Sequence, residues 1–383
     1  MRIAMLPQER FSQAARASRD RLICEALRRA GDTVIPIELP ECSLRLWQRG
    51  WCRGARVLGL RYRPERNPSL LKRCARALQQ QLGRVEADVI LSMSTLHTAY
   101  LATHLPVVNW IDGSFASSVD FYDWHTGLDP LSRWEGHRAE LRSLQQSALT
   151  VFRSAWASQA AARYYSVSPS QLRVLPPGAM LLDTPTRAEA LARSPKAGEL
   201  TSVLIGGDWA RKGADVAWEA VKALQALGTR ASLVTIGMEP PQSLAGADGL
   251  RCVPRLSKDK AAEWCRFRAE LMGADVLLLP SRADFSPNVI PEGYAFGLPA
   301  VASAVGGIPE LIDHGQTGFL VSDGQNPAAY ARYLARLATR PTELARMRGA
   351  SRARYEQEYS LETVARRLSS LLAWAIDEQV EGR

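Results

Sequence analysis

Residues 280–321 decide the fold of this chain, and they read PSRADFSPNVIPEGYAFGLPAVASAVGGIPELIDHGQTGFLV. Residues 275–280 read DVLLLP and contain, after Asp275, a continuous apolar run of the kind that is buried on both faces of a parallel sheet. Asp284 therefore belongs to the loop after a strand, where open α/β sheets bind their ligands. Glu292 follows Pro291, a residue that suits the first turn of a helix. The stretch predicts a strand–loop–helix unit whose two acids face one ligand.

The two acids and the loop between them suit a nucleotide sugar. Carboxylates at a strand end and a helix start accept hydrogen bonds from sugar or ribose hydroxyls. The loop can also cradle a phosphate through backbone N–H groups, which we expect from Phe285, Ser286 and Asn288. The alternative is an ordinary strand–loop–helix unit with solvated acids, which the acid spacing taken alone would favour.

A second strand–loop–helix unit lies earlier in the chain. Residues 201–207 read as a buried strand that ends at Gly207, which we expect to contact the donor, and residues 214–227 read as a helix. The turn between them carries Arg211 and Lys212, a guanidinium and an ammonium group beside helix N–H groups, which suits a diphosphate. The alternative is a basic pair on a solvated helix start.

These motifs resemble the retaining glycosyltransferases of family 4, whose signature is Glu-x7-Glu followed by a GlyxPro, GlyGlyxxGlu and GlyxLeuVal series. The corresponding segments here are Glu292-Gly-Tyr-Ala-Phe-Gly-Leu-Pro299, Gly306-Gly-Ile-Pro-Glu310 and Gly318-Phe-Leu-Val321, with Lys212-Gly213 matching the family's Lys-Gly pair. The chain departs from the pattern at two positions. Asp284 replaces the first Glu, and Asp208 stands near the place of an Arg whose task Arg211 would take over.

The resemblance implies roles for these residues. Asp284 would hold hydroxyls of the transferred sugar, and Glu292 would hold the ribose hydroxyls of the nucleotide. Transfer would occur on the front face of the sugar, with the departing diphosphate oxygen helping to remove the acceptor proton. No Asp-x-Asp occurs in the chain and its histidines lack the spacing of a metal site. We therefore expect no metal and no cofactor, with Arg211, Lys212 and the loop after Asp284 neutralising the leaving group.

Further contacts are expected on both sides of the reaction. Arg255 lies in a loop, residues 254–258, of the kind that selects the donor base. Asp112 follows a predicted strand, in the position where related enzymes place a His or Asp facing the reacting sugar, and is a catalytic candidate on the acceptor side. Its alternative is an ordinary Asp-Gly turn. His97, another acceptor-side candidate, could instead be a capping or packing residue.

Length and pattern predict an α/β protein with two domains, since 383 residues exceed what one core usually serves. The resemblance implies the GT-B architecture, in which two Rossmann-like, doubly wound domains face a central cleft and the last helix crosses back to the first domain. We expect domains at 1–184 and 185–359, with a linker up to about residue 199 and a terminal helix in 360–383. A helix is also expected at 130–146, with Trp134 in the core.

The chain shows no apolar segment long enough to cross a bilayer, and residues 1–7 read as a first strand rather than a signal peptide. The six cysteines form no CxxC pair, which favours reduced thiols in a cytoplasmic protein.

The net charge of +9 is unevenly distributed. Residues 45–76 contain ten Lys or Arg against one acid, with Trp47, Trp51 and Tyr62 among them. Such a stretch suits an anionic membrane surface and would bring the protein to the inner face of the membrane and a lipid-linked acceptor. The alternatives are a site for an acidic glycan and a solvated helical face. Nucleic acid fits less well because no binding module accompanies the charge.

These observations predict a metal-independent, retaining hexosyltransferase. It would move a sugar from a nucleotide-diphosphate sugar to a glycan, lipid-linked or small-molecule acceptor in glycoconjugate or polysaccharide synthesis. A nucleotide-sugar epimerase of the same architecture is an alternative, and would act without an acceptor. A non-catalytic sugar-binding scaffold is another, but it would be expected to have lost a loop acid or the basic pair.

Overall fold

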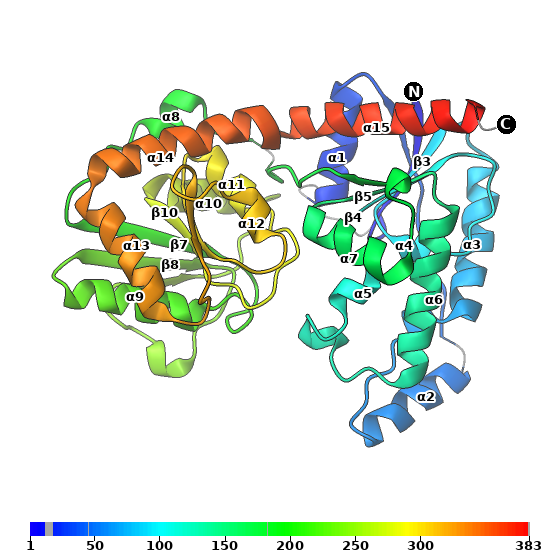
Figure 1. Cartoon of the computed structure of the whole chain (residues 1–383), viewed down its shortest axis with the longest axis horizontal. Coiled ribbons are helices and arrows are strands. Elements are labelled where there is room, and N and C mark those ends of the chain that lie inside the picture. The colour runs from blue at the N-terminus through cyan, green and yellow to red at the C-terminus, as the bar shows by residue number, and fades with distance from the viewer. Residues whose placement is uncertain (12–17, 45, 182, 382–383) are drawn as a thin grey trace. The chain divides into compact units, whose positions relative to one another are not determined.

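The computed structural model describes residues 1–11, 18–44, 46–181 and 183–381. The chain divides into two compact units, the first formed by residues 1–176 and 364–383 and the second by residues 177–363 (Figure 1). The division thus falls earlier in the chain than residue 184, and the second boundary falls inside the last helix, α15 (Leu361–Glu381).

The first unit contains a parallel sheet of six strands in the order β2-β1-β3-β4-β5-β6. The strands are β1 (Arg2–Leu6), β2 (Thr33–Pro36), β3 (Val89–Ser92), β4 (Val107–Ile111), β5 (Leu149–Phe152) and β6 (Leu172–Val174). The helices are α1 (Arg19–Arg29), α2 (Leu46–Val57), α3 (Pro68–Leu82), α4 (Thr95–Thr98), α5 (Phe115–Ser118), α6 (Pro130–Gln146) and α7 (Ala155–Tyr165). From residue 364 onward α15 also belongs to this unit, where Trp374 stacks on Arg173.

Helix α6 begins and ends where the sequence predicts, but the expectation that Trp134 lies in the core is wrong. Trp134 is 54% exposed, and the buried face of α6 is largely polar. Glu135 accepts a hydrogen bond from Asn67 at 2.5 Å, and Glu140 accepts one from Thr95 at 2.8 Å. Hydrophobic periodicity failed here because paired polar side chains occupy the inward face.

The second unit contains a parallel sheet of six strands in the order β12-β11-β10-β7-β8-β9. The strands are β7 (Glu199–Ile205), β8 (Arg230–Ile236), β9 (Leu250–Val253), β10 (Val276–Leu279), β11 (Ala300–Ser303) and β12 (Gly318–Val321). The helices are α8 (Arg187–Leu191), α9 (Ala214–Ala226), α10 (Ala261–Gly273), α11 (Val289–Ala295), α12 (Ile308–Leu311), α13 (Pro327–Thr339) and α14 (Pro341–Arg354).

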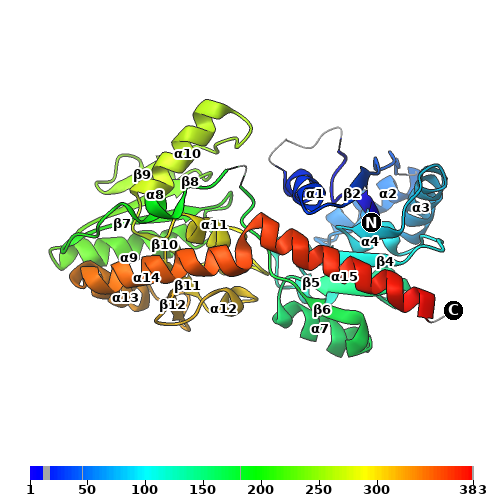
Figure 2. The same cartoon turned by 90° about the horizontal axis from the view of Figure 1, so that it is seen from above.

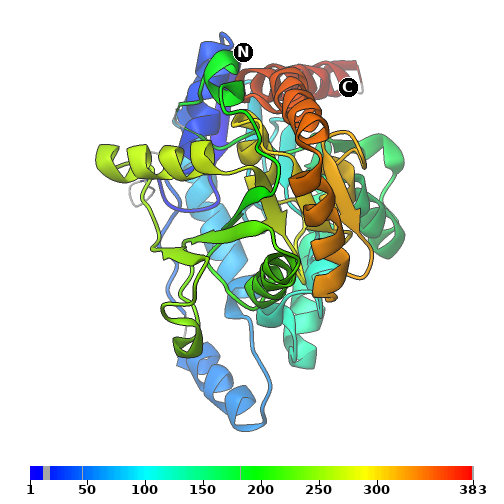
Figure 3. The ribbon, with the colours of Figure 1, turned by 90° about the vertical axis from the view of Figure 1, so that its left-hand side faces the viewer.

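Helices cover both faces of this second sheet. Figures 2 and 3 show α9 and α13 on one face and α10 on the other. Neighbouring residues of β10 point to opposite sides, since Leu278 packs in the cluster with α9 and α13 and Leu277 packs in the cluster with α10 and α11. Burial on both faces explains the continuous apolar run of β10. The doubly wound α/β architecture predicted from the sequence is confirmed.

The strand orders locate one switch point in each sheet. In the second unit the chain runs from β7 outward to β9, then returns to β10 beside β7 and continues outward to β12. In the first unit β1 and β3 are the corresponding neighbours. Ligands of open α/β sheets bind at the carboxyl ends of such strand pairs.

The segment expected to be a linker is packed into the second unit. It contains α8, whose Ala190 carbonyl accepts a hydrogen bond from Arg348 at 2.9 Å. Arg193 forms an ion pair with Asp275 at 3.0 Å. A composition rich in Pro, Ala and Arg therefore does not mark a free segment here.

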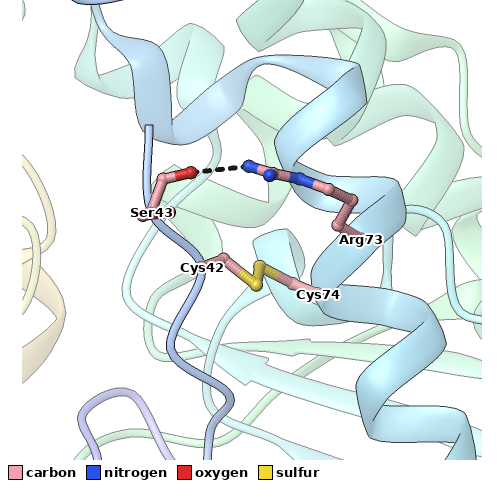
Figure 4. Close-up of a disulfide and its surroundings, with 4 residues drawn as sticks. All are labelled: Cys42, Ser43, Arg73 and Cys74. Atoms are coloured by element: carbon pink, nitrogen blue, oxygen red, sulfur yellow. Dashed lines mark hydrogen bonds between the residues drawn. A yellow bond between two sulfur atoms is a disulfide. The ribbon is translucent and has the colours of Figure 1, made fainter. Parts of the chain in front are cut away.

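The expectation that every cysteine is a reduced thiol is wrong for two of the six. Cys42, in the loop after β2, and Cys74, in α3, form a disulfide (Figure 4). Their Cα atoms lie 6.1 Å apart, although 32 positions separate them in the sequence. That separation hides the pair from a search for short cysteine motifs. The remaining cysteines are free.

Among the described residues no helix is long and apolar enough to span a membrane.

Candidate active site

Two loops of the second unit meet at the carboxyl ends of β7 and β10. The N–H of Arg282, in the loop after β10, donates to the carbonyl of Arg211, in the loop after β7, at 2.8 Å. The guanidinium of Arg211 donates to the carbonyl of Ala283 at 3.0 Å. Arg282 also forms a two-pronged ion pair with Asp215 in the first turn of α9, at 2.7 and 2.8 Å. These bonds fix the two loops against each other.

Gly213 allows the loops to approach this closely. Its φ is +68°, and a Cβ atom built on it would lie 2.0 Å from the carbonyl oxygen of Pro280. Glycine adopts this left-handed conformation without a steric penalty, whereas other residues do not. The Lys-Gly pair therefore has a physical basis: the glycine lets α9 begin beside β10, and the lysine before it turns inward.

Lys212 and Asp284 form a buried ion pair at this place. The ammonium Nζ lies 2.6 Å from Oδ2 of Asp284, and the residues are only 7% and 8% exposed. The hydroxyl of Ser281 donates to the same carboxylate oxygen at 3.2 Å, and Arg211 Nη1 lies 3.8 Å from it. The structure thus brings together three residues that the sequence singled out, namely Arg211, Lys212 and Asp284.

Glu292 lies nearby in α11 and is also buried and paired. Its Oε1 accepts a hydrogen bond from the ammonium of Lys258 at 2.6 Å. Lys258 is held in place by a second bond, to the carbonyl of Met180 at 2.8 Å. Burial raises the pKa of Glu292 above its ordinary value, and the charges of Lys258 and Lys212 only partly oppose this rise.

The other donor-side candidates occupy different places. Phe285 and Ser286 are buried in the loop after β10, and Asn288 is the N-cap residue of α11. Gly207 lies on the exposed loop after β7. Arg255 is exposed on the loop after β9, and the residue of that loop that pairs with Glu292 is Lys258.

The cluster in the second unit combines two acids with three cations. The carboxylates of Asp284 and Glu292 can accept hydrogen bonds from hydroxyls, while Arg211, Lys212 and Lys258 can neutralise phosphate oxygens. No group of three or more His, Cys, Asp or Glu side chains within the described ranges is arranged to hold a metal ion.

The acceptor-side candidate Asp112 lies in the first unit, after β4. Its Oδ1 is 2.6 Å from Nη1 of Arg153, and its Oδ2 is 3.4 Å from Nη1 of Arg19. Burial favours the neutral acid, but the two guanidinium groups outweigh it and hold the pKa of Asp112 below its ordinary value. Arg153 itself is fully buried beside Trp110, and burial lowers its pKa to about 10. Asp112 is thus an anchored carboxylate rather than a simple turn residue.

His97 lies in α4, at the switch point between β1 and β3. It lines a cavity of about 330 Å³, together with side chains of the loops after β1 and β2 and of α3: Gln8, Glu9, Arg10, Leu39, Pro40, Cys74 and Leu78. Burial lowers the pKa of His97 to about 4, against the opposing effect of the Pro7 and Gln8 backbone, so its imidazole is neutral at pH 7. Its Nε2 atom has no hydrogen-bond partner among the described residues.

Three charged residues of these clusters escaped the sequence analysis. Lys258 lies in the loop that the sequence predicts to select the donor base, but the residue predicted from that loop is Arg255. Arg153 directly follows β5. Residues directly after a strand lie at the ligand-binding edge of the sheet, and this signal, which predicts Asp112 after β4, also predicts Arg153. Arg19 offered no signal, because its contact with Asp112 spans 93 positions of the chain.

Comparisons with known proteins agree with this geometry. Residues 200–340 match the model of the glycosyl transferases group 1 family. This segment runs from β7 to beyond β12 and includes Arg211, Lys212, Lys258, Asp284 and Glu292, so the similarity to this family lies in the second unit, where the cluster is.

Two curated relatives extend the match. The chain is 33% identical over 225 residues to a D-inositol 3-phosphate glycosyltransferase of Streptomyces scabiei, covering 53% of this chain and 48% of the relative. It is 35% identical over 173 residues to the amylovoran biosynthesis glycosyltransferase AmsK of Erwinia amylovora, covering 42% of each. The chain therefore spans about half or less of the length of these relatives.

Solved structures support the fold over the whole chain. Sucrose-phosphate synthase from Thermosynechococcus elongatus superposes with a TM-score of 0.69 at 18% identity, covering 99% of this chain and all of that one. HepE from Anabaena, solved in complex with UDP, superposes with a TM-score of 0.65 at 13% identity, covering 97% and 100%. These likenesses identify the fold as GT-B.

Proposed function

We propose that this protein is a metal-independent, retaining glycosyltransferase that uses a nucleotide-diphosphate sugar. The observation that carries the proposal is a set of two acid–lysine contacts, the buried pair Lys212–Asp284 and the partly buried pair Lys258–Glu292. They lie at the switch point of a sheet that matches the glycosyl transferases group 1 family. Hydroxyl acceptors and phosphate-binding cations are thus combined at the place where open sheets bind nucleotides.

Each member of the cluster has a role in this proposal. Asp284 accepts hydrogen bonds from hydroxyls of the transferred sugar, and Glu292 accepts them from the ribose. Arg211 and Lys212 neutralise the charge that develops on the diphosphate as it leaves, a task that needs fixed cations in a site with little water. Backbone N–H groups of Phe285, Ser286 and Asn288 remain predicted phosphate contacts, and Gly207 and Arg255 remain predicted donor contacts.

The proposed transfer takes place on one face of the sugar. The bond between the anomeric carbon and the diphosphate oxygen breaks, and the acceptor oxygen bonds to the same face of that carbon. The acceptor proton passes to the departing diphosphate oxygen, so no protein nucleophile is needed. Anchoring by Arg153 and Arg19 keeps Asp112 ionised, which suits a carboxylate that stabilises positive charge on the sugar ring.

The acceptor we propose is a glycan, a lipid-linked molecule or a small molecule in glycoconjugate or polysaccharide synthesis, with His97 among the acceptor-side residues. The name of the Erwinia amylovora relative supports a biosynthetic role of this kind. We propose a cytoplasmic location on the basis of the nucleotide-sugar donor alone. The cysteines do not support it, because Cys42 and Cys74 form a disulfide.

Incubation with a panel of UDP-, GDP-, ADP- and dTDP-sugars tests the proposal. We expect one donor to release its nucleoside diphosphate, equally well with and without EDTA, and the transferred sugar to keep its anomeric configuration by NMR. Interconversion of the nucleotide sugar without an acceptor would instead identify an epimerase. If the protein neither binds any of these donors nor releases a nucleoside diphosphate from one, the proposal is overturned.

A further inference from the structure

Helix α2 and the turn after it carry an exposed apolar face. Trp47 and Trp51, one helical turn apart, are 48% and 50% exposed, and Leu58 is 75% exposed. At 100° per residue these three positions fall within a 40° sector of the helix surface. Figures 1 and 3 show α2 at the periphery of the first unit.

This face is not the one that holds α2 on the protein. Gln48 and Ala55 are buried and lie on another side of the helix, about 80–100° from Trp47. Tyr62 is buried behind the helix and meets Trp51 edge-on, with ring centroids 6.5 Å apart. Burial of Gln48 and Ala55 anchors the helix, while the tryptophan face stays open to solvent. Solvated apolar side chains that share one face mark an interaction surface.

A basic face lies on the side of α2 opposite the apolar one. Arg49, Arg53 and Arg56 are exposed and project from a sector about 60° wide, and α2 contains no acid. No ion pair involves any of the three among the described residues, whereas Glu65, the single acid of residues 45–76, pairs with Arg63 at 3.7 Å. The positive charge of α2 is therefore available to an external anion.

We propose that α2 lies in the headgroup region of an anionic bilayer, with Trp47, Trp51 and Leu58 inserted and Arg49, Arg53 and Arg56 on lipid phosphates. Tryptophan prefers the membrane–water interface, and an amphipathic helix with a cationic face binds there through apolar burial and charge together. A polyanionic glycan would use the arginines but has no apolar layer for two tryptophans and a leucine. A protein partner would need acidic side chains of its own placed opposite all three arginines.

Membrane binding by α2 goes beyond the proposed transferase activity, and each of the two proposals can be disproved without the other. The cluster of acids and cations around Lys212 and Asp284 lies in the second unit, whereas α2 belongs to the first unit. Nucleoside diphosphate release from a soluble donor should therefore be unchanged by substitutions in α2.

Vesicle flotation with the full chain tests the proposal. We expect binding to vesicles that contain 30% phosphatidylglycerol, little binding to pure phosphatidylcholine vesicles, and weakening as salt is raised. The Arg49→Gln, Arg53→Gln, Arg56→Gln variant should bind the anionic vesicles about a hundredfold more weakly, since each arginine near such a surface contributes about a fivefold factor. The Trp47→Ser, Trp51→Ser variant should lose binding even at low salt.

Matched controls separate this surface from general charge and hydrophobicity. The triple variant Arg29→Gln, Arg230→Gln, Arg340→Gln removes the same charge from exposed arginines elsewhere, and Trp134→Ser removes an exposed tryptophan from α6. Both should bind like the unmodified protein, and circular dichroism should show all four variants folded. Brominated lipids should quench tryptophan fluorescence less in the Trp47→Ser, Trp51→Ser variant.

Three results would overturn the proposal. These are an unmodified chain that does not float with anionic vesicles, control variants that lose binding as strongly as the α2 variants, and a chain that binds a sulfated polysaccharide through α2 but not the vesicles.

Discussion

The ammonium of Lys212 lies 2.6 Å from the carboxylate of Asp284, although the two residues are 72 positions apart in the sequence. Both are buried, so each charge depends on the other for its stability. The pair joins the loop after β7 to the loop after β10 and sets an ammonium group beside two carboxylates, because Lys212 also acts electrostatically on Glu292.

Replacement of Lys212 by Ala should lower turnover roughly a hundredfold, because a fixed cation that stabilises leaving-group charge is lost. Donor affinity should change less than turnover. The control is Lys222→Ala in α9, the helix that follows Lys212, because this lysine is exposed and paired with Glu219. Steady-state kinetics of the two variants, with circular dichroism to verify folding, measure the difference. Equal turnover in both would remove Lys212 from the site.

Donor binding should weaken as the pH falls through the raised pKa of Glu292. The ionised carboxylate accepts hydrogen bonds from ribose hydroxyls, and protonation removes part of this capacity. Stability should follow the opposite trend: a buried acid with a raised pKa favours its neutral form, so its contribution is full below the ordinary value of 4.5 and is lost as the pH rises through the raised pKa.

The variant Glu292→Gln tests both trends. In calorimetric donor titrations and thermal melts over the range pH 4–8, this variant should lose the part of each pH dependence that Glu292 causes and should keep the acid sensitivity that His97 adds. Glu219→Gln, on the exposed side of α9, should keep both. A Glu292→Gln protein that still shows both trends would contradict the assignment.

Gly213→Ala should destabilise the second unit by about 3 kcal/mol or more, because the new Cβ would meet the Pro280 carbonyl and the backbone would be strained at φ +68°. Gly228→Ala is a matched control: its φ is +83°, but nothing lies within 4 Å of the added atom. That variant should cost only about 1–2 kcal/mol. Urea unfolding of both proteins measures the difference, and equal losses would disprove the close approach.

His97 should titrate near pH 4 in NMR spectra of the folded protein. Because burial lowers the folded-state pKa below the ordinary 6.5, the stabilising contribution of neutral His97 is full above pH 6.5 and is lost as the pH falls towards 4. His97→Asn should remove this part of the acid sensitivity. A His97 signal that titrates near pH 6.5 would place the ring in solvent.

The disulfide of Cys42 and Cys74 predicts a specific alkylation pattern. Mass spectrometry of the unfolded, unreduced chain should show four modified cysteines, and six after reduction. Closing a loop of this length stabilises a protein by roughly 3–4 kcal/mol. The Cys42→Ser protein should therefore melt earlier than the Cys265→Ser protein, whose cysteine is exposed and free. Six modified cysteines without reduction would exclude the bond.

The strand–loop–helix units around Lys212 and Asp284 could be predicted because their signals are local. A run such as that of β10 has to be buried on both faces, and polar residues directly after it must lie at the edge of the sheet. Glycines at the ends of such runs mark where the chain turns, as at Gly213.

The contacts that complete the clusters could not be predicted, because they depend on long-range geometry. Lys258 reaches Glu292 across 34 positions, and Arg19 reaches Asp112 across 93. Neither spacing leaves a periodic trace in the sequence. Hydrophobic periodicity also misled at Trp134, because α6 buries Glu135 and Glu140 and leaves the tryptophan in solvent.

The most direct test of the central claim is a calorimetric titration of the donor panel into the unmodified protein and the Glu292→Gln variant at pH 7.5. We predict that at least one nucleotide-diphosphate sugar binds the unmodified protein, and that the folded variant binds it at least tenfold more weakly. If no donor binds, or if both proteins bind it equally, the second unit does not hold a nucleotide sugar through Glu292.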